Sequence, residues 1–142
     1  MRLYLDTSLV VTALVTEPNS EVVNRWLEQH AACRFVVSDW VVAEFSAALS
    51  VKLRSNRLSE EARARALERL ADLLDSEIEC LPVLREHFRQ ATAFADRSSV
   101  GLRAGDALHL ALAANHAIKL CTRDQLQAQA GAGLAVLTEL VP

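Results

Sequence analysis

The sequence predicts an α/β domain: a three-layer α/β/α sandwich with a central, mainly parallel sheet. Short apolar runs of strand length alternate with longer segments whose apolar residues recur at helical spacing, and this alternation is the pattern of βαβ units. The apolar runs are continuous, as expected of strands that are buried on both faces. No repeat, linker or low-complexity segment divides the 142 residues, so we expect a single domain over residues 1–142.

The first half of the chain should supply two strands and four helices. The strands are predicted at the apolar runs 3–5 and 35–37. The helices are predicted at about 7–14, 20–30, 39–54 and 60–74. Ser38 and Ser59 are suited to cap the last two helices, and we expect these two to pack as an antiparallel pair.

The second half should supply three strands, at 78–81, 118–121 and 134–137, and three helices. The first two helices are expected at about 83–95 and 104–117, with a polar loop between them. The helix at 104–117 is apolar nearly all round, so it should be buried. Thr122 and Gln125 form a T-x-x-Q capping box that predicts a short third helix, which Gly131 and Gly133 should end.

Composition narrows the class of protein further. Hydrophobic residues make up 51% of the chain and charged residues 23%, which is typical of a globular domain. Lys and Arg total 15 against 18 Asp and Glu, a formal charge of -3, so the basic excess of a typical nucleic-acid binder is absent. Three widely spaced Cys, no signal-peptide pattern and no apolar run of membrane-spanning length predict a cytoplasmic protein with no membrane partner.

Two acidic residues follow predicted strands. Asp6 comes directly after the first strand, and Asp124 follows the strand at 118–121, at the start of a helix. Ligands of open α/β sheets bind beyond the carboxyl ends of the strands. If both strands are parallel and lie near the centre of the sheet, the two carboxylates share one edge.

Two further acidic residues lie in helices that should be packed. Glu44 borders the apolar face of its helix, and Asp106 opens the helix that is almost wholly apolar. Each of the four acids alone can be explained as a cap, a first-turn acid or half of an ion pair. Together, and without matched bases, they predict a cation between them because like charges held close repel. All-oxygen ligands select hard cations, so we expect one or two Mg²⁺ or Mn²⁺ ions, which can assist phosphodiester hydrolysis.

The same residues resemble a known family. The blocks that carry the resemblance are D-T-S at 6–8, S-D-W-V-V-A-E-F-S-A-A-L at 38–49, R-A-G-D-A-L-H-L-A-L-A at 103–113 and T-R-D at 122–124. They are similar to PIN-domain ribonucleases, and above all to VapC-type toxins of bacterial type II toxin–antitoxin pairs. The resemblance spans about residues 3–137, and its specific part is the four blocks in this order and spacing.

The resemblance implies a Mg²⁺- or Mn²⁺-dependent ribonuclease that cleaves RNA, forms a homodimer and is inhibited by a cognate antitoxin. By residue match, the acids that bind the metal and carry catalysis would be Asp6, Glu44, Asp106 and Asp124. The supporting hydroxyls, which orient acids, ligands or waters, would be Thr7, Ser8 and Thr122. Many relatives have a large apolar residue three positions after the last acid, where this chain has Gln127.

Three other features each leave two interpretations open. His109 could reach the acids, although packing or hydrogen bonding within the core is favoured. The basic stretch 52–69 could follow RNA phosphates, or it could be a solvated face with pairs such as Glu61–Arg65. Trp40 could stack on a nucleobase, although core or dimer packing is favoured.

Two alternative functions belong to other classes. The chain could be a catalytically weak PIN-like scaffold that binds protein or RNA, which the four intact acids disfavour. It could also be a phosphatase or receiver-type protein. A haloacid-type phosphatase has a second Asp where this chain has Ser8, and a receiver has adjacent acids near the N-terminus, which are absent here.

Overall fold

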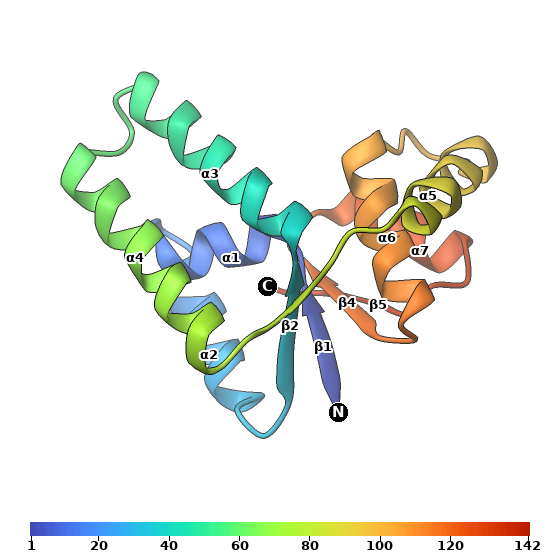
Figure 1. The fold of residues 1–142 in the computed structure, drawn as a ribbon, viewed down its shortest axis with the longest axis horizontal. Helices are drawn as coiled ribbons and strands as arrows, with labels where there is room; N and C mark the ends of the chain where they lie inside the picture. The colour runs from blue at the N-terminus through green and yellow to red at the C-terminus, as the bar shows by residue number, and fades with distance from the viewer.

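Five short strands form one sheet in the order β3-β2-β1-β4-β5, and every neighbouring pair is parallel. The structure is a computed structural model that describes all 142 residues. The strands are β1 (Arg2–Leu5), β2 (Arg34–Ser38), β3 (Glu79–Leu81), β4 (Lys119–Thr122) and β5 (Thr138–Leu140). β1 lies at the centre of the sheet (Figure 1), and the predicted parallel sheet is confirmed.

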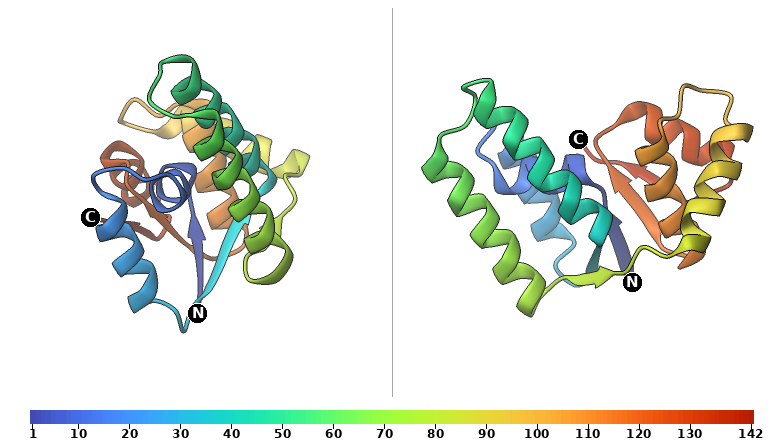
Figure 2. Two further views of the ribbon diagram at one scale, coloured as in Figure 1. Left: turned by 90° about the vertical axis from the view of Figure 1, so that its left-hand side faces the viewer. Right: turned by 45° about the horizontal axis from the view of Figure 1, so that its top comes forward.

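Seven helices cover the two faces of the sheet. They are α1 (Thr7–Leu14), α2 (Ser20–Gln29), α3 (Asp39–Arg54), α4 (Glu60–Ser76), α5 (Arg85–Arg97), α6 (Ala104–Asn115) and α7 (Gln125–Gly133). The first four lie on one face and the last three on the other (Figures 1 and 2). Right-handed crossovers produce this division, because the chain moves outward from β1 to β3 and then returns past β1 to β4 and β5. The predicted three-layer α/β/α sandwich is confirmed.

The α3–α4 pair forms an antiparallel hairpin that leans away from the sheet (Figure 1). Ser38 Oγ accepts a hydrogen bond from the backbone of Val41, and Ser59 Oγ accepts one from the backbone of Ala62. These bonds satisfy backbone N–H groups that have no partner within the first turn. The predicted caps and the predicted antiparallel pairing are therefore confirmed.

One cluster of 32 buried hydrophobic residues joins the sheet to both helical layers. α6 contributes seven consecutive buried residues, Ala107–Ala113, so its predicted burial is confirmed. Removing this apolar surface from water is the main favourable contribution to folding. No helix has both the length and the apolar character needed to cross a membrane.

Two predictions for the C-terminal part are wrong. The last strand lies at Thr138–Leu140 and not at 134–137, because the chain turns after α7, with Val136 N–H donating to Gly131 O and Ala135 at a φ of 59°. An apolar run alone does not distinguish such a turn from a strand. Thr122 does not cap α7 either. It is the last residue of β4, and Asp124 is the cap, accepting from the Gln127 N–H.

The helix predicted at 83–95 is displaced by two residues, to Arg85–Arg97. The backbone N–H of Leu84 donates to His87 Nδ1 at 2.9 Å. This bond fixes the extended residue before the helix, which has a φ of -104° and a ψ of 163°. The helix therefore begins two positions later than the apolar pattern indicates.

Candidate functional site

The carboxyl ends of β1 and β4 meet at the point where the strand order reverses. Leu5 is in register with Cys121, and the Asp6 N–H donates to Cys121 O at 3.1 Å. Asp124 stands two residues beyond the end of β4. The expected common edge for Asp6 and Asp124 is confirmed, and it is the edge where open α/β sheets bind ligands.

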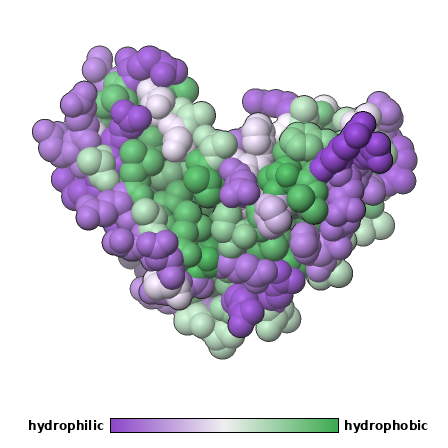
Figure 3. Space-filling model, in the orientation of Figure 1, coloured by the Kyte–Doolittle hydropathy of each residue, from purple (hydrophilic) through white to green (hydrophobic).

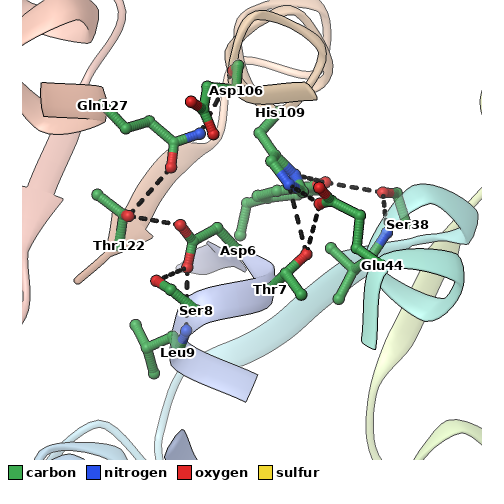
Figure 4. Close-up of polar contacts among 12 residues, drawn as sticks. Asp6, Thr7, Ser8, Leu9, Ser38, Glu44, Asp106, His109, Thr122 and Gln127 are labelled. Carbon is green, nitrogen blue, oxygen red and sulfur yellow. Dashed lines mark hydrogen bonds and ion pairs between the residues drawn. The ribbon is translucent and has the colours of Figure 1, made fainter. Parts of the chain in front are cut away.

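Asp6 is buried, with 3% of its surface exposed. It is the N-cap of α1: Oδ1 accepts from the Leu9 N–H at 3.1 Å and from Ser8 Oγ at 2.7 Å. Oδ2 accepts from Thr122 Oγ1 at 2.5 Å (Figure 4). Burial raises the pKa of Asp6, although the hydrogen bonds from Thr122 and Ser8 oppose that shift. The carboxylate is thus held in one orientation at a substantial cost in desolvation.

Gln127 connects two of the acid-bearing segments. Its side chain is buried, with Oε1 3.1 Å from Thr122 Oγ1 and Nε2 donating to the backbone oxygen of Asp106 at 3.3 Å. Thr122 Oγ1 also accepts from the Asp124 N–H at 2.9 Å. Because a hydroxyl has one proton, Thr122 donates to Asp6 Oδ2, the nearer of its two possible acceptors. The departure from the apolar residue of many relatives therefore supplies an amide that ties α7 to the first turn of α6.

Glu44 is reached by donors from two other helices. Thr7 Oγ1 on α1 donates to Glu44 Oε1 at 2.6 Å, and His109 Nε2 on α6 lies 2.5 Å from the same oxygen. Burial raises the pKa of Glu44, but the interactions with His109 and Thr7 outweigh it, so the pKa lies below its ordinary value. The space beside Oε2 is narrow, since a Cβ added to Gly105 would lie 3.3 Å from that oxygen.

Behind Glu44 lies a buried polar group at the centre of the sheet. The Tyr4 hydroxyl is 2.7 Å from Ser38 Oγ and 3.0 Å from His109 Nδ1. Tyr4 and Ser38 are fully buried, and burial raises the pKa of the Tyr4 phenol above its ordinary value. The phenol therefore keeps its proton and remains a hydrogen-bond donor.

Asp106 and Asp124 are less constrained than the other two acids. Both are half-buried, and the Asp106 carboxylate makes no hydrogen bond or ion pair within the protein. Burial raises the pKa of Asp106, and the negative charges of Asp124 and Glu44 raise it further. Asp6, Glu44 and Asp106 surround a common space (Figure 4), but no three acidic, His or Cys side chains form a ready-made metal cage.

Sequence reasoning missed part of this arrangement. The motifs pick out all four acids and the three hydroxyls. They give Tyr4 no role beyond its place in a strand, and Ser38 none beyond that of a helix cap. They also leave His109 within the core and treat Gln127 as a packing difference. The one available signal was the polar hydroxyl of Tyr4 within an otherwise apolar strand, because a buried phenol usually needs a hydrogen-bond partner.

The basic stretch 52–69 lies around the α3–α4 turn, at the opposite end of α3 from Glu44 (Figure 1). The suggested pair between Glu61 and Arg65 is not formed. The side chains of Arg57, Arg65 and Arg69 instead line a cavity of about 360 Å³. The stretch therefore keeps exposed positive charge, although at a distance from the acids.

Trp40 packs beside the site. A Cβ added to Gly105 would lie 3.3 Å from the Trp40 ring, and the indole N–H is buried without a hydrogen-bond partner. The ring also lines an apolar recess of about 360 Å³ with Phe88 and Leu108. The indole is therefore partly used in packing α3 against α6.

The fold and the site together define a class: α/β proteins whose carboxylates gather at the carboxyl edge of a parallel sheet. The family model described as the PIN domain matches residues 3–132. This chain belongs to the PIN domain family. No curated protein sequence matches the chain.

Several solved structures share the fold. VapC20 of Mycobacterium tuberculosis, described as a toxin that cleaves the sarcin-ricin loop, is 19% identical with a TM-score of 0.73, covering 91% of this chain and 95% of its own. VapBC2 of Rickettsia felis, bound to a DNA fragment from its promoter, is 17% identical with a TM-score of 0.72 and 98% coverage of both chains. FitAcB of Neisseria gonorrhoeae is 22% identical with a TM-score of 0.66, covering 96% of this chain and 95% of its own. At these identities the likeness concerns the fold.

Proposed function

We propose that this chain is a Mg²⁺- or Mn²⁺-dependent endoribonuclease that acts as the toxin of a VapC-type toxin–antitoxin pair. The observation that carries the proposal is the group of four acids, Asp6, Glu44, Asp106 and Asp124, at one edge of the sheet. None of them forms an ion pair with a Lys or Arg. A group of like charges without matched bases is stabilised when a cation lies between them.

The available donors fit a hard divalent cation. All are oxygen atoms, and Glu44 Oε2 and both oxygens of the Asp106 side chain make no hydrogen bond within the protein. Mg²⁺ usually keeps several waters and binds proteins through one or two carboxylates, so a ready-made cage is not required. We assign the four acids as ligands of one or two ions, directly or through water.

The neighbouring hydroxyls have matching supporting roles. Ser8 and Thr122 hold the two oxygens of Asp6, and Thr7 holds Glu44. When bound, the metal supplies the Lewis acidity that phosphodiester hydrolysis requires. These hydroxyls orient the carboxylates of Asp6 and Glu44. The bound cation would also reduce the repulsion between the acidic site and an RNA phosphate.

A recess on the α1–α4 face supports the proposed antitoxin partner. It has a volume of about 490 Å³ and lies between α1, α2 and α4, with mainly apolar walls that include Leu14, Leu27 and Leu73. An apolar surface of this kind is stabilised when a partner covers it. We therefore expect the antitoxin to cover this recess.

We also propose that the chain forms a homodimer. Hydrophobic residues reach the surface on both lobes of the face shown in Figure 3. Among the large exposed hydrophobic side chains are Phe88 on α5, 54% exposed, and Val51 on α3, 46% exposed. Light scattering of the purified chain measures its mass, and a monomer at micromolar concentration would contradict the dimer.

The nuclease is tested with purified protein, free of antitoxin, incubated with mixed cellular RNA and Mg²⁺ or Mn²⁺. The comparison variant is Asp6→Asn, and the matched control is Asp75→Asn, which makes the same chemical change at an exposed position on α4. We expect cleavage by the wild type and by the control, and its loss in Asp6→Asn and on addition of EDTA.

Two results would contradict the proposal in different ways. Cleavage that survives Asp6→Asn would exclude the four-acid mechanism. An absence of cleavage, together with no Mn²⁺ binding by calorimetry, would favour the catalytically weak scaffold that binds protein or RNA.

A further inference from the structure

A continuous set of buried and partly buried hydrogen bonds connects the centre of the sheet to Glu44. The Tyr4 hydroxyl contacts Ser38 Oγ at 2.7 Å and His109 Nδ1 at 3.0 Å. His109 Nε2 lies 2.5 Å from Glu44 Oε1, which also accepts from Thr7 at 2.6 Å. The contacts run from the N-cap of α3, through β1 and α6, and back to α3 at Glu44.

Counting donors and acceptors fixes the direction of each bond. An ionised carboxylate only accepts, so His109 Nε2 carries the proton that faces Glu44. Nδ1 is then the acceptor, and the Tyr4 hydroxyl donates to it. The Tyr4 oxygen accepts from Ser38, whose own oxygen accepts from the N–H of Val41. In this arrangement every proton has an acceptor.

The opposite direction leaves a donor unsatisfied. With a proton on Nδ1, Tyr4 would have to donate to Ser38, and the Ser38 proton would have no other acceptor among its contacts. Leaving a buried hydroxyl unpaired is unfavourable. In the tautomer with its proton on Nδ1 alone, the Nε2 lone pair would also face the Glu44 carboxylate.

We propose that His109 is a positioning residue for Glu44, held by Tyr4 in the tautomer whose Nε2–H fixes Glu44 Oε1 and leaves Oε2 for the metal. The inference rests on the proposed function because it treats Glu44 as a metal ligand. Oε2 has no hydrogen bond within the protein, and the absence of a side chain at Gly105 keeps the narrow space beside it open, because a Cβ there would lie 3.3 Å from this oxygen. Groups that orient metal ligands in this way typically affect metal affinity by about 10- to 100-fold.

Tyr4→Phe is the decisive variant because it removes the hydroxyl and keeps the ring. Without that donor, His109 can carry its proton on either nitrogen, so the donor to Glu44 is no longer fixed. We expect a mixture of tautomers and a fall of about tenfold in Mn²⁺ affinity, measured by calorimetry. His109→Gln can place an amide N–H toward Glu44, so it should keep more affinity than His109→Leu.

Nitrogen-15 NMR of the histidine rings reads the tautomer in metal-free protein. His87 is an internal control, because its Nδ1 accepts from the Leu84 N–H and its Nε2 faces Asn115 Oδ1 at 3.3 Å. We expect both rings to carry the proton on Nε2 in the wild type. In Tyr4→Phe, only the signals of His109 should change, and unchanged signals from His87 would show that the fold is intact.

Three outcomes decide the inference. A proton on Nδ1 of His109 in the wild type would overturn it, and so would a Tyr4→Phe variant with unchanged tautomer and unchanged Mn²⁺ affinity. A wild type with the expected tautomer that neither binds Mn²⁺ nor cleaves RNA would instead refute the proposed function, and with it the role of His109 toward a metal. The tautomer measurement therefore separates the two failures.

Discussion

Asp6 is held at a cost to stability, and Asp6→Asn should therefore stabilise the metal-free protein while it abolishes cleavage. The amide oxygen can keep the hydrogen bonds that Oδ1 accepts from Leu9 and Ser8. The amide nitrogen can donate to Thr122 Oγ1, and the Thr122 hydroxyl can then donate to Gln127 Oε1, which is 3.1 Å away. The network reverses direction, and the buried charge is gone.

The stability of Asp6→Asn is best compared with that of Asp6→Ala. That variant removes the cap of α1 and so leaves the buried Leu9 N–H unpaired, which should cost about 1–3 kcal/mol. Asp6→Asn keeps the hydrogen bond from the Leu9 N–H and removes the buried charge, so it should be more stable than the wild type at neutral pH. The two variants should thus differ by more than about 2 kcal/mol, which is roughly 6 °C in Tm.

The pH dependence has a definite sign. The folded pKa of Asp6 is raised above the ordinary value of 3.8, so the ionised group destabilises the wild type at neutral pH. The advantage of Asp6→Asn should be complete above the folded pKa, shrink as the pH falls through it, and vanish below 3.8. Thermal melts in EDTA from pH 3 to 8 measure this difference. An Asp6→Asn variant as unstable as Asp6→Ala would refute the reasoning.

Two further predictions concern the packing around β5. Gly131→Ala should destabilise by about 1–3 kcal/mol in urea unfolding, because the new Cβ would lie 2.2 Å from Thr138 Cγ2. The new Cβ of Gly133→Ala meets nothing within 4 Å, so this variant should be neutral or stabilising by up to about 1 kcal/mol. Equal changes in the free energy of unfolding for the two glycine variants would contradict the packing argument. Glu139→Gln should cost about 1 kcal/mol near neutral pH, because Glu139 accepts from Lys119 at 2.7 Å and has a side chain only 29% exposed. Burial raises the pKa of Glu139, but the donors that contact it bring the pKa below 4.5. The stability cost of Glu139→Gln should therefore persist above pH 4.5 and disappear as the pH falls through the folded pKa. A stability difference between the wild type and Glu139→Gln that remains at pH 3 would contradict this account.

The sequence by itself determined the fold class, the order of the elements and the position of each acid along the chain. It did so because burial on both faces of a strand and on one face of a helix leaves a periodic apolar pattern. The caps Ser38 and Ser59 were predictable for a similar reason, since a cap acts within one turn of its own helix. The motifs around Asp6, Glu44, Asp106 and Asp124 added the resemblance to PIN-domain proteins, which the match over residues 3–132 bears out.

The tertiary structure alone decided which of these polar groups touch. Thr122 is two residues from Asp124 and fits a local cap, yet its hydroxyl turns to Asp6, 116 positions away in the chain. Gln127 reaches Asp106, and His109 reaches Glu44 across 65 positions. Hydrogen bonds between distant segments have no periodicity along a sequence, because they depend on the order in which parallel strands are laid side by side. The local pattern thus located the acids, and the packing of β1, β4, α3 and α6 decided how each one is held.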